Sequence, residues 1–217
     1  MQTHGLARYA PLTGAAAVLF WIFGAVVTDM DAPADNASGA EIAAYMVDND
    51  WQIFTGSALF SFGSALFIWF MASLAAHLRA AGDDGRLATV MVSGGVATAA
   101  VASLVTAPQV AGALAIENMD RALAPETAET LWLLGDGVII PASLLAVALM
   151  GAAALAILRT GALPAWFGYV TAVLTLGLLV FPVGWAILIW GIPLWTIVVS
   201  VWIFLRGRPA PAAVGGP

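Results

Sequence analysis

The sequence predicts an all-α integral membrane protein, a polytopic transmembrane helix bundle with six spans and a short outer amphipathic helix. Composition predicts the class, because 62% of the 217 residues are hydrophobic and only 9% are charged. Soluble domains usually carry about 25% charged residues. Two further observations predict the architecture: six apolar segments are long enough to cross a membrane, and nearly all arginines fall on one side of them.

The same composition argues against several classes of function. A net charge of −6 argues against nucleic-acid binding, which needs clustered lysine and arginine. All seven basic residues are arginines, so no lysine is present to form a Schiff base with a cofactor. The absence of cysteine excludes disulfides, thiolate metal sites and cysteine nucleophiles. We expect no cofactor, no metal site and no enzymatic activity.

The spans follow from the apolar segments, since a helix needs roughly 20 apolar residues to cross the hydrocarbon core. The predicted spans are 10–28, 52–77, 88–115, 131–158, 164–181 and 184–205. The last two belong to one apolar stretch, which as a single helix would measure about 65 Å, roughly twice the bilayer core. The chain must therefore fold back, and residues 181–184 (FPVG) are the natural turn.

The arginines predict the orientation of the bundle. With six spans, only Arg121 lies on one side, and the other side holds Arg8, Arg79, Arg86, Arg159, Arg206 and Arg208. Because arginine-rich loops mark the cytoplasmic side, both termini are expected in the cytoplasm and the protein in the cell membrane. The outer loops hold ten of the thirteen carboxylates. The predicted parts are a cytoplasmic tail (1–9), the six-span domain (10–205) with outer loops 29–51 and 116–130, and a Pro/Gly-rich cytoplasmic tail (206–217).

The first span has an alternative interpretation. Arg8, the apolar run and Ala32-Pro33-Ala34 resemble a secretory signal with its cleavage site. Cleavage would leave five spans and an outer N-terminus. The apolar run is slightly long for a signal, and proline is poorly placed beside a cleavage point, so we favour a retained span.

Two segments predict packing. Residues 38–41 (SGAE) fit a capping box, and Ile42, Tyr45 and Met46 then share one face of a short helix that lies on the membrane or caps the bundle. The third span carries small residues every four positions on two adjacent faces, which predicts a central helix. These are Gly94, Thr98, Ala102 and Thr106, and Gly95, Ala99, Ser103 and Ala107. The serines of the second span, Ser57, Ser61 and Ser64, are expected to be structural.

One carboxylate lies inside an apolar run, in "LWLLGDGVIIPAS" (131–143). Asp136 lies about 7 Å below the outer end of the fourth span. A charge at mid-membrane costs about 2.5–3.5 kcal/mol on insertion scales, and less near the interface. Such a residue normally faces the bundle interior and has a partner. Candidate partners are polar residues that lie at a similar depth in the membrane. They are Thr106 and Gln109 on the third span, Gln52, Thr55 and Ser57 on the second span, and Arg121 in the loop above them.

These residues predict a polar pocket in the outer third, built from spans two, three and four. Gly135 and Gly137 allow a neighbour to approach the Asp136 backbone, and Pro141 leaves the Gly137 carbonyl without its usual amide donor. Asp136 would be the polar anchor for a ligand, Gln109 and Thr106 would assist it, and Trp132 would line the entrance. In the alternative, Asp136 pairs with Gln109 or Arg121 and locks the bundle.

Three segments carry a resemblance to known sequences: "LRTGALPAWFGYVTAVL" (158–174), "SGAEIAAYMVDN" (38–49) and "LGDG" (134–137). In them the chain resembles a group of uncharacterised integral membrane proteins of high-GC Gram-positive bacteria, classed as a domain of unknown function. The likeness covers most of the chain. It implies six spans and no assigned activity.

The functional expectation is a non-enzymatic membrane protein that binds or moves a small lipophilic or weakly polar molecule near Asp136. Its partners are the lipid bilayer, that ligand, and a membrane-protein partner or a second copy of the chain. In the competing interpretation, an accessory or assembly protein engages another membrane protein, and Asp136 is structural.

Overall fold

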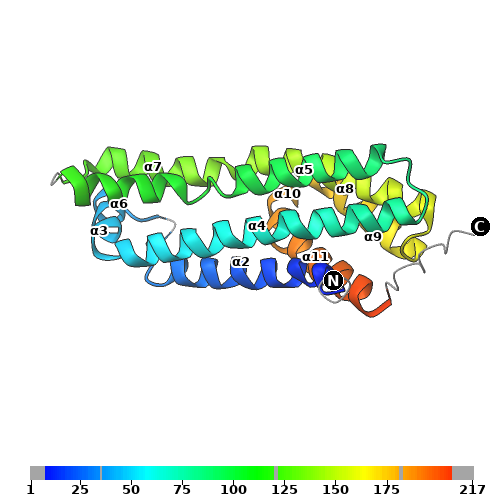
Figure 1. Cartoon of the computed structure of the whole chain (residues 1–217). Coiled ribbons are helices and arrows are strands. Elements are labelled where there is room, and N and C mark those ends of the chain that lie inside the picture. The colour runs from blue at the N-terminus through cyan, green and yellow to red at the C-terminus, as the bar shows by residue number, and fades with distance from the viewer. Residues whose placement is uncertain (1–7, 35, 120–121, 181–182, 207–217) are drawn as a thin grey trace, which may run out of the picture.

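The computed structural model describes residues 8–34, 36–119, 122–180 and 183–206, and every regular element in them is helical, which confirms the all-α prediction. In Figure 1 the longer helices run side by side along one axis. The elements are η1 (Ala10–Leu12), α2 (Thr13–Asp29), α3 (Gly39–Asp48), α4 (Asp50–Ala80), α5 (Arg86–Ala102), α6 (Ala107–Met119), α7 (Pro125–Gly137), α8 (Ile139–Thr160), α9 (Ala165–Leu178), α10 (Val183–Ala186), the π-helical η2 (Ile187–Gly191) and α11 (Ile192–Arg206).

Five helical stretches in the described residues are long and apolar enough to cross a membrane. They are Ala10–Asp29, Asp50–Ala80, Arg86–Ile116, Pro125–Thr160 and Val183–Arg206. The predicted span 164–181 corresponds to α9, whose 14 residues measure about 21 Å, less than the roughly 30 Å of a hydrocarbon core.

The bundle has two distinct ends. We call the end closed by α3 the cap end, and the opposite end, where η1 begins and α11 finishes, the arginine end (Figure 1). The described arginines lie at the helix termini of that second end, at Arg8, Arg79, Arg86, Arg159 and Arg206.

Glycines set the close approach of the helices. A Cβ atom built on Gly24 of α2 would lie 2.9 Å from the Gly56 carbonyl oxygen of α4, and one built on Gly56 would lie 2.9 Å from the Gly24 oxygen. On α5, a Cβ atom at Gly94 would lie 2.5 Å from the Leu149 backbone nitrogen of α8, and Gly95 faces Met71 of α4. Helix α5 therefore contacts two neighbours through its small-residue faces, as the sequence predicts.

The third and fourth predicted spans correspond to two of these apolar stretches, and each is divided into two helices. Helix α5 ends in tight turns, in which the Leu104 and Val105 amides bond three residues back, and α6 begins at Ala107. Helix α7 meets α8 at Val138, three residues before Pro141. Both breaks have a proline shortly after them, and proline supplies no amide donor to the preceding turn.

The two breaks lie against each other. A Cβ atom at Gly135 of α7 would be only 2.6 Å from the Val105 carbonyl oxygen. Gly135 is buried, and it is the residue next to Asp136. The close approach at Gly135 therefore sets the rotation of α7 just where the carboxylate projects.

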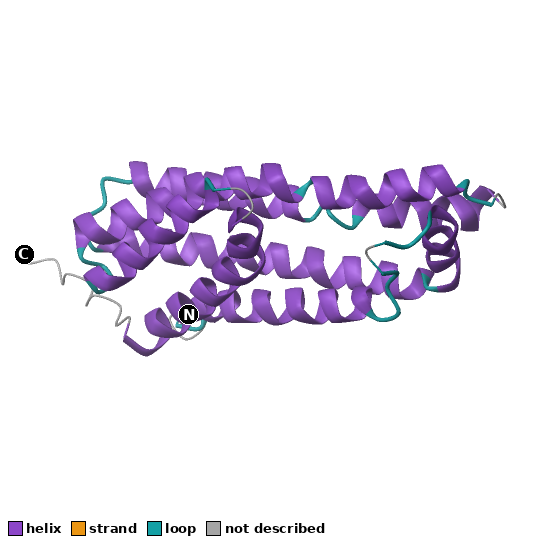
Figure 2. Ribbon diagram, turned by 180° about the vertical axis from the view of Figure 1, so that it is seen from behind, coloured by secondary structure: helices purple, strands orange, loops and turns teal. Residues whose placement is uncertain are grey.

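Helices α9, α10 and α11 cover only part of the bundle, and Figure 2 shows α11 crossing the long helices at an angle. The Trp195 indole N–H of α11 donates to Thr171 Oγ1 of α9 over 2.9 Å. The Ser200 hydroxyl donates to the Pro11 carbonyl, and Ser200 Oγ accepts from the Ala15 amide. Residues 181 and 182 of the predicted turn lie outside the described residues, but Gly184 packs against the Leu178 carbonyl, as a fold-back requires.

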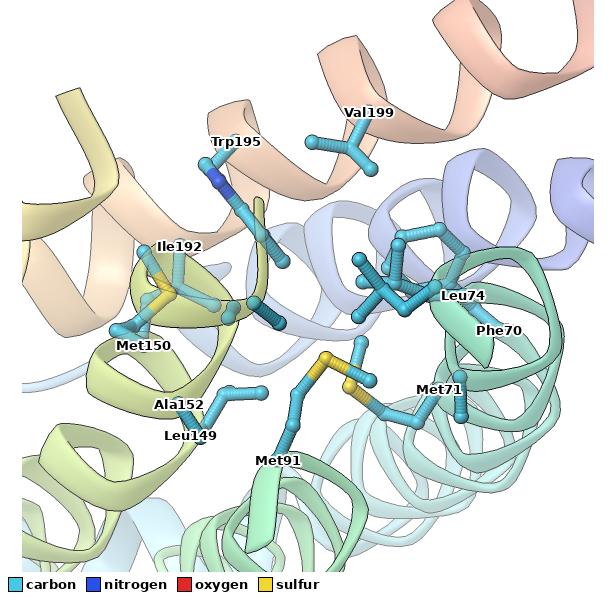
Figure 3. Close-up of a cluster of buried hydrophobic side chains, with 14 of the residues drawn as sticks. Phe70, Met71, Leu74, Met91, Leu149, Met150, Ala152, Ile192, Trp195 and Val199 are labelled. Carbon is cyan, nitrogen blue, oxygen red and sulfur yellow. The ribbon is translucent and has the colours of Figure 1, made fainter. Parts of the chain in front are cut away.

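The buried apolar side chains form two clusters. The larger one joins α4, α5, α8, α9 and α11 towards the arginine end, and Figure 3 shows its centre, with Met71, Met91, Leu149 and Trp195. The smaller one lies under α3 and buries Ile42, Tyr45, Met46, Ile53, Ala113 and Ala128. The predicted capping box is confirmed, with Ser38 and Glu41 reciprocally bonded, and α3 caps the helix ends.

A hydrogen-bond network joins three elements between the two clusters. Ser64 Oγ of α4 accepts from the Trp21 indole N–H of α2 at 3.2 Å and from Ser103 Oγ at the end of α5 at 3.0 Å. The Ser64 hydroxyl itself donates to the Phe60 carbonyl. This serine of the second predicted span is structural, as expected.

The glycine contacts lead to a paired stability test. We expect Gly94→Ala to cost about 1–3 kcal/mol, because its Cβ meets the backbone of α8 and cannot be relieved by a side-chain rotation. Gly151→Ala is the matched control, since its Cβ would make an ordinary contact of 3.4 Å with Thr175. Removing a mid-helix glycine should leave that variant as stable or slightly more stable. Equal unfolding midpoints in detergent for the two variants would contradict this account.

Candidate functional site

Asp136 lies at the junction of α7 and α8 and lines a pocket of about 400 Å³. The pocket is formed by the α7–α8 junction, the end of α9 and the beginning of α10. We call it the Asp136 pocket, and its lining is Asp136, Gly137, Ile139, Ile140, Ser143, Leu144, Leu178, Leu179, Gly184 and Trp185. The Asp136 side chain is exposed, so the prediction that it faces the bundle interior is wrong.

The lining of the pocket contains several hydrogen-bond acceptors, and the Trp185 indole N–H is a donor in the same lining. Besides the Asp136 carboxylate, the Gly137 carbonyl lacks its usual intrahelical donor because Pro141 has no N–H. Ser143 is 6% exposed, and its hydroxyl donates to the Ile139 carbonyl at 2.9 Å, so its oxygen lone pairs can accept. Leu178 and Leu179 mark the carboxyl end of α9, where carbonyl groups concentrate.

The remaining walls are apolar and open to the outside of the bundle. Ile140, Leu144 and Leu179 are 51%, 57% and 57% exposed, whereas Leu178 is buried. Trp185 is partly exposed at α10. The pocket therefore joins an acidic rim to an apolar surface that faces outward.

The other three predicted site residues do not line this pocket. Thr106 lies in the α5–α6 break, where its carbonyl accepts from the Val110 amide. Gln109 is half-buried on α6. Trp132 packs edge-on against Tyr45, with ring centroids 5.9 Å apart, in the cluster under α3. Of the predicted walls, the fourth span (α7–α8) lines this pocket, whereas α9 and α10 take the place of the second and third spans.

The sequence prediction missed the α9–α10 side of the pocket. Gly184, in the predicted turn, and the neighbouring Trp185 are far from Asp136 in the sequence, so neither indicated a contact with it. Arg121, the predicted alternative partner of Asp136, lies outside the described residues.

Polar side chains are also buried near the cap end. In the described part of the chain, Oε1 of Gln52, Oγ of Ser57 and Oε1 of Gln109 are buried without a hydrogen-bond partner in the protein. Gln52 is 4% exposed, and its amide nitrogen lies 3.4 Å from Asp31 Oδ2. All three residues were candidate partners of Asp136 in the sequence analysis. The structure buries these atoms within the protein, and none of the three residues lines the Asp136 pocket.

A second pocket, of about 470 Å³, lies between the loop after α2 and helix α3, and Asp31, Glu41, Tyr45 and Asn49 are among its lining residues. The Tyr45 hydroxyl donates to the Thr28 carbonyl at 2.6 Å. Burial, together with the charges of Asp29 and Asp31, raises the pKa of Tyr45. The Ser38 amide and hydroxyl lower the pKa of Glu41 by donating hydrogen bonds to its carboxylate.

Comparison with known proteins finds no matching family model, no matching curated protein and no matching solved structure. The resemblance to six-span bacterial membrane proteins stays a prediction, and the candidate site is argued from its own geometry.

The Glu41 contacts predict a pH dependence of helix α3. Because the folded state lowers the Glu41 pKa, its contribution is fully present above the unfolded pKa, near 4.5, and is lost as the pH falls through the lower folded value. We expect hydrogen exchange in α3, corrected for the intrinsic rate, to lose protection as the pH falls below about 4.5. Glu41→Gln keeps the shape without the charge and should abolish this dependence. The same acid-induced loss in both variants would assign it to another group.

Proposed function

We propose that the chain is a six-span protein of the cell membrane that binds or moves a small lipophilic or weakly polar molecule in the Asp136 pocket, without enzymatic activity. Five apolar stretches of sufficient length support insertion into a bilayer. Helix α9 would be the sixth span, short by itself and extended by Leu179 and Val180.

The charges support an orientation with both termini in the cytoplasm. All the described arginines lie at one end of the bundle, and the acidic cap, with Asp31, Glu41, Asp48 and Asp50, lies at the other. Because arginine marks the cytoplasmic side, the cap end is assigned to the outside. The Asp136 pocket then lies in the outer half of the bundle.

The observation that carries the ligand-binding proposal is a carboxylate on the rim of a pocket with apolar walls. Ligand sites are typically hollows of about 300–1,000 Å³, mostly apolar, with a few polar groups that orient the ligand. The Asp136 pocket, about 400 Å³ in volume, has this composition. An ionisable residue at membrane depth indicates function by default, because keeping it there costs free energy.

A second candidate function is supported by exposed side chains on α7. Leu133 and Leu134 are 59% and 56% exposed, one turn from Asp136 towards the cap. Adjacent exposed leucines favour contact with lipid or with another membrane protein. In that alternative the chain is an assembly partner, and Leu133→Ser with Leu134→Ser should release a partner that Asp136→Asn leaves bound. Chemical cross-linking in native membranes measures this difference.

Filling the pocket tests the leading proposal. We expect Leu144→Trp to occupy the space beside Ile140 and to reduce labelling of residues 136–144 by a photoreactive fatty alcohol at least tenfold. Leu155→Trp is the matched control, because Leu155 is also exposed on α8, at 48%, but does not line the pocket. The measurement is peptide mass spectrometry of protein labelled in phosphatidylcholine nanodiscs. Uniform labelling of all exposed helix faces, unchanged by either variant, would rule out a specific pocket.

A further inference from the structure

We propose that the arginine end of the bundle binds an anionic phospholipid beside helices α9 and α11, with the Arg206 guanidinium as the contact to the phosphodiester head. This inference goes beyond the proposed function, since it concerns the arginine end and does not involve the Asp136 pocket. It follows from the packing of Arg206, from the distribution of carboxylates along the chain and from the exposed apolar side chains of the two helices.

Arg206 is held on an aromatic surface at the last turn of α11. Its guanidinium carbon lies 4.0 Å from the centre of the Trp202 ring. Trp202 in turn packs edge-on against Phe167 of α9, with ring centroids 5.3 Å apart, and Phe167 stacks on Trp166. A guanidinium over a ring uses its face, so the N–H groups in its plane stay available to the oxygens of a phosphate group, which they match as a fork. The aromatic contact therefore places Arg206 without using its donors.

The helices around Arg206 contain almost no acidic side chains. The sequence has no aspartate or glutamate before Asp29 or after Asp136. The elements η1, α8, α9, α10 and α11 therefore have no carboxylate side chain, and in α2 the single one is its last residue, at the cap end. This side of the arginine end thus has basic groups without acidic groups of its own.

The carboxylates at the arginine end belong to the turn between α4 and α5, where Asp83 and Asp84 lie. Asp83 accepts hydrogen bonds from two backbone amides of this turn and of α5. Asp84 lies 4.0 Å from the Arg86 guanidinium. Both carboxylates therefore have partners in their own turn, and within the described residues none lies within 4.0 Å of Arg206.

Helix termini do not decide the sign of the charge near Arg206. Helices α8 and α11 finish at this end and present carbonyl groups, whereas η1 and α9 begin there and present amides. The net positive charge therefore comes from the exposed side chains of Arg8, Arg159 and Arg206. Arg8 lies 5.6 Å from the Phe204 ring, so α11 has a guanidinium on two of its aromatic residues. Anions from outside the protein must balance these charges.

Exposed apolar side chains favour a lipid over a soluble anion. Trp166 and Tyr169, near the beginning of α9, are 52% and 64% exposed, and such rings prefer the headgroup level of a membrane. Towards the middle of the bundle, the two helices expose further apolar side chains, which are Val170, Val173 and Leu176 on α9 and Leu194, Val198 and Val201 on α11. A phosphate head at Arg206 therefore places its acyl chains along these helices.

The experiment measures lipid binding to the full chain in dodecyl maltoside by native mass spectrometry. The probes are phosphatidylglycerol and phosphatidylcholine with identical acyl chains, so that the head alone differs. We expect the first phosphatidylglycerol to bind at least tenfold more tightly than the first phosphatidylcholine. Arg206→Gln should lower the affinity for phosphatidylglycerol about fivefold, the contribution of one arginine near anionic lipid, and leave the affinity for phosphatidylcholine unchanged.

Two control variants keep the result interpretable. Arg86→Gln removes the same charge from the same end, but from a residue beside Asp84, and should change the affinity for phosphatidylglycerol less than twofold. Arg206→Lys retains the charge and should retain most of the preference, which separates loss of charge from loss of fold if Arg206→Gln is unstable. Equal affinity of the unmodified chain for the two lipids would overturn the proposal, and so would equal losses in Arg206→Gln and Arg86→Gln.

Glycerol phosphate, which has the phosphate head without the acyl chains, distinguishes a lipid from a soluble anion. We expect millimolar glycerol phosphate to leave phosphatidylglycerol bound. Displacement of the lipid would assign Arg206 to a soluble phosphate and overturn the lipid proposal. Each of these measurements is independent of labelling at the Asp136 pocket, so a failure here leaves the proposed function standing.

Discussion

The structure depends on backbone-to-backbone contact between helices, because lipid supplies no hydrophobic drive to bring apolar helices together. Gly24 and Gly56 place α2 against α4, and Gly94 places α5 against α8. At Gly135 the same kind of contact holds α7 against the Val105 carbonyl. Consecutive residues on a helix are about 100° apart, so with Gly135 facing inward, Asp136 is turned towards the outside. The exposure of the carboxylate is thus a consequence of packing at its neighbour.

The pocket itself arises from unequal helix lengths. Helix α8 has 22 residues and α9 has 14, and the two are packed together from the arginine end. Measured from the arginine end, α9 therefore does not reach as far along the bundle as α8. The chain turns into α10 beside the α7–α8 junction. The pocket is the space left where the shorter helix ends. The backbone carbonyls near Leu178 and Leu179 come from the same cause, since a helix terminus exposes carbonyls.

The sequence predicted what depends on composition and periodicity: the helical class, the helix that begins after Ser38, the small-residue faces of α5 and the structural role of Ser64. It did not predict the breaks near Val105 and Val138, although a proline follows each of them. It also placed Asp136 against α6. Depth matching is one-dimensional: it orders residues along the bundle axis but does not give the rotation of a helix. That rotation is set by contacts such as the one at Gly135, which are distant in sequence.

The two hydrogen bonds of Ser200 link the last helix to the first, across almost the whole length of the chain. Loop-closure entropy must be overcome before so distant a contact can form. The Pro11 carbonyl and the Ala15 amide cannot make these bonds until α11 has been synthesised. The contact between the first helix and the last therefore becomes possible only at the end of chain elongation.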